Sequence, residues 1–123
     1  MSLNGGLIAE SLQIGKPLTG VTLTVRTISR ADAGDADAGQ PLTWTFIDFE
    51  APEGDADELA AALHDVLDPA LGWYCDFRTA QETFVVFSGR IFRYPRGDRA
   101  RRAEVEQYAR SVGVPESQLD WPE

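Results

Sequence analysis

Residues 42–67, LTWTFIDFEAPEGDADELAAALHDVL, contain the two patterns that decide the fold. Residues 42–50 alternate between apolar and polar side chains, which is typical of a strand with one buried face. Residues 55–67 carry leucine, alanine and valine at helical spacing, so they predict a helix with one buried stripe. Asp55 and Glu58 at its start have the spacing of a capping box. This stretch therefore predicts a strand followed directly by a helix.

The same order extends outward on both sides of this stretch. Residues 21–28 alternate apolar and polar side chains and predict a strand antiparallel to the one that follows. Further along, residues 73–78 predict a third strand and residues 83–94 a fourth, with a bend or bulge at Gly89. Residues 98–112 then predict a second helix, capped at its start by an aspartate.

The resulting order, ββαββα, predicts one α+β domain over residues 1–123. Its expected architecture is a two-layer sandwich, with a four-stranded, mainly antiparallel sheet and both helices on one face. A permuted ferredoxin-like arrangement contains the same elements. In the N-terminal segment, residues 1–20, we set residues 1–3 aside, and residues 6–14 fit either a helix or a short strand. Residues 31–41, ADAGDADAGQP, lack large apolar side chains and predict a flexible acidic loop.

The charge balance limits the classes of partner. The chain has 20 acidic and 11 basic residues and a net charge of -9. Because such a field repels phosphate groups and anionic lipid headgroups, we expect neither a nucleic-acid nor a membrane partner. The chain also has no apolar run long enough to span a bilayer, and its start lacks the features of a signal peptide. We therefore predict a cytoplasmic protein.

Strand alternation places aromatic and charged side chains together on one face of the predicted sheet. A surface of this composition is typical of binding or self-association. The candidate partner-binding residues on this face are Trp44, Phe46, Tyr74, Arg26 and Arg78. Three interpretations stay open at this point. The face binds a protein partner or a second copy of the chain, it binds a flat small molecule, or the N-terminal segment or the tail around Trp121 covers it as a smaller core.

A cluster of arginines is the second candidate site. Residues 90–102 contain six arginines and one acidic residue, Asp98, where the second helix is expected to begin. A helix N-terminus with arginines beside it is suited to hold a phosphate or a carboxylate. The candidate ligand-binding residues are Arg90, Arg93, Arg96, Arg99, Arg101 and Arg102. The alternative is that these arginines neutralise the acidic half of the same molecule.

The titratable residues predict no assembled catalytic set. His64, the single histidine, fits a partly exposed helix position better than a general base. Cys75, the single cysteine, is expected to be buried and inert in a strand. Asp48, Glu50 and Asp76 share the predicted mixed-charge face, where cross-strand pairing with arginines is the ordinary role and acid–base chemistry the alternative.

The sequence predicts no cofactor and no metal. One cysteine and one histidine are too few for a multi-cysteine zinc site or an iron–sulfur cluster. The acidic loop lacks the ligand spacing of an EF-hand. Neither the glycine patterns of nucleotide-binding loops nor the nucleophile and zinc motifs of hydrolases occur.

Two stretches, GWYCDF at residues 72–77 and FVVFSGRIFRYPRGD at residues 84–98, resemble small uncharacterised proteins of high-GC actinobacterial genomes. The resemblance covers the C-terminal two-thirds of the chain, and that group has no activity known to us, so it implies no site residues. The leading hypothesis is a non-catalytic association domain that binds itself or another protein. The alternative is a small-molecule-binding protein or enzyme that holds an anionic ligand with the arginine cluster.

Overall fold

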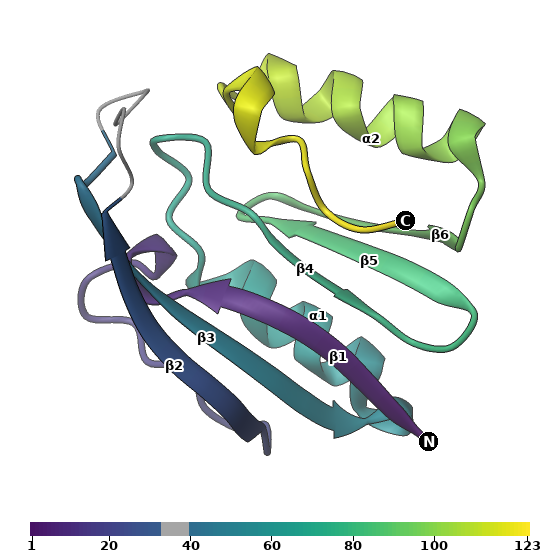
Figure 1. The fold of residues 1–123 in the computed structure, drawn as a ribbon, viewed down its shortest axis with the longest axis horizontal. Coiled ribbons are helices and arrows are strands. Elements are labelled where there is room, and N and C mark those ends of the chain that lie inside the picture. The colour runs from purple at the N-terminus through teal and green to yellow at the C-terminus, as the bar shows by residue number, and fades with distance from the viewer. Residues whose placement is uncertain (33–39) are drawn as a thin grey trace.

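The chain forms a single antiparallel sheet and two helices in a computed structural model, which describes residues 1–32 and 40–123 (Figure 1). In chain order the elements are β1 (Ser2–Ile8), η1 (Ala9–Ser11), β2 (Thr24–Asp32), β3 (Thr43–Pro52), η3 (Glu53–Asp55), α1 (Ala56–Val66), β4 (Cys75–Arg78), β5 (Glu82–Phe87), β6 (Arg90–Pro95), α2 (Arg99–Ser111) and η4 (Glu116–Gln118). The strands lie in the order β2-β3-β1-β4-β5-β6. The α+β class is confirmed, but the sheet has six strands rather than four.

The first additional strand is β1, which lies at the centre of the sheet in a segment whose pattern left helix and strand open. It pairs with β3 from Ser2 to Ile8 and with β4 from Asn4 to Gly6. Leu3 is fully buried in the core, although residues 1–3 carry no fold prediction. The prediction missed this strand because glycines at two successive positions weaken any strand signal.

The second additional strand arises because β5 and β6 form a hairpin. Ser88 and Gly89 make a two-residue turn, after which Arg90 pairs with Phe87. The prediction of one strand with a bend at Gly89 is therefore wrong. A two-residue turn that contains glycine reverses the chain rather than bending it. The six strands also differ in order from the permuted ferredoxin-like arrangement.

The two helices pack on opposite faces of the sheet, so the prediction that both cover one face is wrong. β5 explains this arrangement, because it is apolar on both sides. Phe84 and Val86 pack in the cluster beneath α1, whereas Val85 and Phe87 pack in a second cluster with α2. Each apolar face of a strand needs a layer to bury it, and one helix supplies each layer.

The C-terminal tail covers part of the α2 face of the sheet. Trp121 is 3% exposed, and its Nε1 donates a hydrogen bond of 2.8 Å to the Tyr94 hydroxyl. Arg102 stacks on the Trp121 ring at 4.4 Å and donates to the Trp121 carbonyl at 2.8 Å. The tail therefore packs over the β5 and β6 half of this face, as one of the sequence interpretations has it. Two hollows remain over the β3, β1 and β4 half.

The predicted acidic loop, residues 31–41, is described at its two ends. Ala31 and Asp32 belong to β2. Gln40 is buried and donates a hydrogen bond of 2.7 Å to the Leu71 carbonyl. Residues 33–39, on which the prediction of flexibility chiefly rests, lie outside the described residues.

Candidate functional site: a cleft between the two halves of the sheet

The candidate site lies where β1 and β4 part. The two strands pair from Asn4 to Gly6 on β1, and β1 then continues with β3 to Ile8, whereas β4 begins at Cys75. Beyond Gly6 the two halves of the sheet are no longer joined by a strand ladder. A cleft of about 370 Å³ opens at this point, on the face opposite α1.

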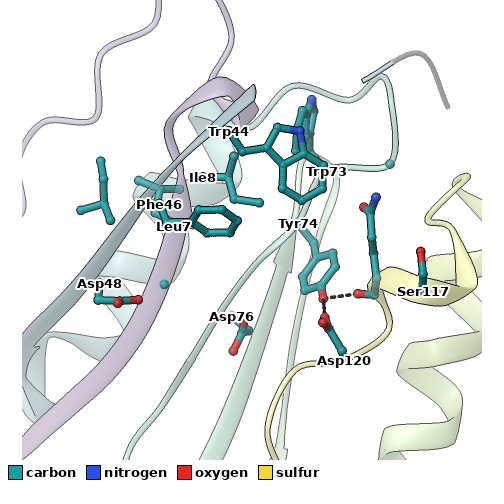
Figure 2. Close-up of a pocket in the computed structure, with 14 residues that line it drawn as sticks. Leu7, Ile8, Trp44, Phe46, Asp48, Trp73, Tyr74, Asp76, Ser117 and Asp120 are labelled. Carbon is teal, nitrogen blue, oxygen red and sulfur yellow. Dashed lines mark hydrogen bonds between the residues drawn. The ribbon is translucent and has the colours of Figure 1, made fainter. Parts of the chain in front are cut away.

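The walls of the cleft are rich in aromatic side chains. Alternation along β3 turns Trp44 and Phe46 toward it, and Trp73 and Tyr74 line it from the segment that enters β4. Ring centroids lie 6.0 Å apart between Trp44 and Phe46 and 5.5 Å apart between Trp44 and Trp73. Figure 2 shows Trp44 and Phe46 on one side, Asp120 of the tail on the other, and Tyr74 between them.

Ser117, Gln118 and Asp120 of the C-terminal tail form one wall of the cleft. Hydrogen bonds hold this wall in place. Tyr74 donates through its hydroxyl to the Gln118 carbonyl, and Asp120 Oδ1 lies 3.5 Å from the same hydroxyl (Figure 2). Gln118 donates through Nε2 to the buried Gln40 side chain at 2.7 Å. Burial, together with the charges of Asp76 and Asp120, raises the pKa of Tyr74, so this hydroxyl stays a donor. Hydrogen bonds within the chain thus fix this wall of the cleft.

A second hollow of about 360 Å³ continues the cleft along the closed part of the sheet and shares Gly6, Asp48 and Asp76 with it. It adds Arg26 and Arg78, so we call it the charged end. Gly6 forms a bare floor between the two carboxylates, because it is the register partner of both Asp48 and Asp76. A Cβ added at Gly6 would meet only Asp48 Oδ1, at 3.5 Å.

Asp76 is the most strongly perturbed carboxyl group of the site. Its side chain is 19% exposed and pairs with Arg78 at 2.6 Å. Burial raises the pKa of Asp76 to about 6, and the charge of Asp120 acts in the same direction, while Arg78 opposes the shift. The site therefore changes its charge between mildly acidic and neutral pH.

The raised pKa of Asp76 predicts a measurable pH dependence of stability. The unfolded carboxyl group releases its proton near pH 3.8 and the folded one near pH 6, so the folded state binds more protons between these values. Stability should therefore fall as pH rises through this window, by roughly 2 kcal/mol relative to Asp76→Asn. Urea unfolding of both proteins at several pH values measures the difference. A difference that stays constant from pH 4 to pH 7 would contradict the raised pKa.

The structure brings the five candidate partner-binding residues to the cleft and its charged end, which together we call the groove. Trp44, Phe46 and Tyr74 line the cleft, and Arg26 and Arg78 line the charged end. Sequence reasoning missed the floor of the groove, because β1 was not recognised as a strand. A tail over this face was one of the open interpretations, but no local pattern shows that residues 117–120 form one wall of the cleft.

The six arginines of the second candidate site are not gathered. Arg93 lies on the α1 face, where it pairs with Asp57 at 2.6 Å and with Glu82 at 2.7 Å. On the opposite face, Arg102 donates to the tail, and Arg90 stacks on the Phe92 ring at 4.5 Å.

The other three arginines of this set are also distributed separately. Arg96 donates to the Thr79 carbonyl at 3.3 Å, Arg101 pairs with Glu104 at 3.3 Å, and Arg99 is exposed at the start of α2. Of the six, Arg93, Arg101 and Arg102 pair with acidic side chains in the described part of the chain, and only the Asp57 partner of Arg93 lies in the acidic half of the chain.

Three further titratable residues considered as catalysts, Cys75, His64 and Glu50, do not line the cleft. Cys75 is buried as predicted, donates through its thiol to the Gly6 carbonyl at 3.2 Å, and has a pKa raised by burial. His64 is partly exposed on α1, and its Nδ1 lies 3.0 Å from Asp65 Oδ1. Glu50 pairs with Arg26 at 2.7 Å, the cross-strand ion pair that the sequence favours.

Comparisons of the chain with protein-family models, with curated proteins and with solved structures found no match. Among residues 1–32 and 40–123, no three histidine, cysteine or acidic side chains are grouped as ligands for a metal ion. No helix in this part of the chain has the length and apolar character needed to cross a membrane.

Proposed function

We propose that this protein is a non-catalytic association domain that binds a segment of another protein in the cleft between β1 and β4. The observation that carries the proposal is the preformed, aromatic-lined cleft, whose Trp44, Phe46 and Tyr74 rings are each partly exposed. Its volume of about 370 Å³ lies at the lower end of the range of small-molecule pockets, about 300–1,000 Å³, so it can enclose only a small part of a partner.

Aromatic side chains of this kind dominate the binding energy of protein interfaces, because they bury a large area with little loss of conformational entropy. The cleft continues along the strands into the charged end beside Arg26 and Arg78, so an extended segment can run from one hollow into the other. Self-association at the same face is less favourable, because a second copy brings another net charge of -9.

A substitution at the floor of the cleft tests the proposal. Gly6→Leu places a side chain in the cleft, where a Cβ meets no backbone atom within 4 Å, so the fold should persist. The matched control is Gly54→Leu, because a Cβ at Gly54 also meets open space and Gly54 does not line the cleft. Both variants should unfold in urea with the same cooperativity as the wild type.

The measurement is a selection of short linear peptides from a displayed library on the wild-type protein. We expect enriched peptides to lose at least tenfold in affinity for Gly6→Leu and to keep their affinity for Gly54→Leu. Enriched peptides that bind Gly6→Leu as tightly as the wild type, or no enrichment above an unrelated acidic protein, would overturn the proposal. A dimer that dissociates on Gly6→Leu substitution would instead make a second copy the occupant.

A further inference from the structure

The charged side chains that line the cleft are all acidic. Its lining includes Asp48, Asp76 and Asp120 and, among the described residues, no lysine, arginine or histidine. Arg78 pairs with Asp76 from the charged end. In the described part of the chain no ion pair involves Asp48 or Asp120. Two carboxylates therefore remain without a cationic partner at a cleft whose walls are aromatic.

Elsewhere in this protein, aromatic rings are covered by arginines of the same chain. Arg90 lies 4.5 Å from the centre of the Phe92 ring, Arg93 lies 4.7 Å from that of Phe84, and Arg102 stacks on the tail tryptophan. Over the described residues, no such arginine lies on the rings that line the cleft. A cation placed over those rings is attracted by their negative faces.

The geometry points to a partner segment with a lysine or arginine, whose cationic group enters the cleft between Trp44 and Tyr74, within reach of Asp120 and Asp48. This inference rests on the proposed function and names the chemistry of the occupant. An acidic segment would be repelled by the same carboxylates. A neutral segment would displace water from these carboxylates without supplying a positive charge to compensate for their lost hydration. The negative field of the whole chain also draws a basic partner toward this face.

The inference is tested with blocked pentapeptides, acetyl-Gly-Gly-Xaa-Gly-Gly-amide, in which Xaa is arginine, lysine, glutamine or glutamate. Binding is followed by two-dimensional amide NMR, with the Trp44 indole N–H as the local reporter. We expect the arginine and lysine peptides to bind about tenfold more tightly than the glutamine peptide, and the glutamate peptide to bind most weakly. The preference should weaken as salt is added.

Two substitutions connect the preference to the cleft. Asp48→Asn and Asp120→Asn should each reduce affinity for the arginine peptide about threefold to tenfold and leave the glutamine peptide unchanged. The matched control is Asp65→Asn, because Asp65 is an exposed acid on α1, on the opposite face of the sheet. It removes the same charge from the chain without changing the cleft.

The possible failures of the two proposals are distinguishable. If library peptides bind in a manner that Gly6→Leu abolishes, but glutamine and arginine peptides bind equally, the cation inference is overturned and the association function stands. The cation inference is also overturned if the enriched library sequences carry no excess of lysine and arginine. If neither library nor pentapeptides show binding that Gly6→Leu abolishes, the association function itself fails.

Discussion

Gly5→Ala should destabilise the fold by about 3 kcal/mol, although it adds a single methyl group. Gly5 lies in the central strand β1, directly between its register partners Phe49 and Phe77. A Cβ at this position would lie 2.5 Å from the Phe77 Cβ, 2.7 Å from the Phe49 ring and 2.8 Å from the Asp76 carbonyl oxygen. Two of these atoms belong to the backbone or its first side-chain carbon, so β1 and β4 would have to separate.

The neighbouring glycine is the control for this prediction. Gly6→Ala adds the same methyl group on the cleft face, where its nearest neighbour is a carboxylate oxygen at 3.5 Å. This variant should be as stable as the wild type or gain about 0.4–1 kcal/mol, because alanine restricts the unfolded chain. Urea unfolding of the two single variants compares them directly. Equal stability of Gly5→Ala and Gly6→Ala would contradict the close packing of β1 against the two phenylalanines.

Leu63→Ala should cost about 2–5 kcal/mol through lost burial and the cavity that it leaves. Leu63 is fully buried on α1, within the cluster that includes Leu59 and the core faces of β1, β4 and β5. Thermal or urea unfolding measures the loss. A cost below about 1 kcal/mol would mean that α1 repacks and does not bury this side chain as described.

The adjacent His64→Ala substitution separates core packing from chemistry. The His64 side chain is 36% exposed, and its partner Asp65 is more exposed still, so its removal should change stability by no more than about 0.5 kcal/mol. Peptide binding in the cleft should also be unchanged, because His64 lies on the opposite face. Loss of binding in this variant, with the fold intact, would contradict the placement of the site.

Gly5 and Gly6 also show how the site depends on the fold. On the core side of β1, Gly5 has no side chain, so β3 and β4 pack closely against it. On the other side, the absence of a side chain at Gly6 leaves the floor of the groove bare between Asp48 and Asp76. The strand that holds the sheet together is therefore the strand that shapes the proposed binding surface.

Local sequence patterns determined most of the individual elements. The alternation in residues 42–50, the helical stripe that includes Leu63, and the cap of α2 at Asp98 each appear in the structure close to their predicted positions. Alternation also placed Trp44, Phe46 and Tyr74 on one face, and these residues now line one cleft. These features depend on interactions between residues close in the chain, and such interactions leave a periodic trace in the sequence.

Tertiary structure alone decided the rest. The central position of β1 depends on the fit of Gly5 between Phe49 and Phe77, residues far away along the chain, and a glycine carries no pattern of its own. The opposite placement of the helices follows from the burial of β5 on both faces, and the cleft from the point where β1 and β4 separate. Strand order, close contact and the docking of the tail join residues far apart in the chain, so no local window of sequence contains the interactions that select them.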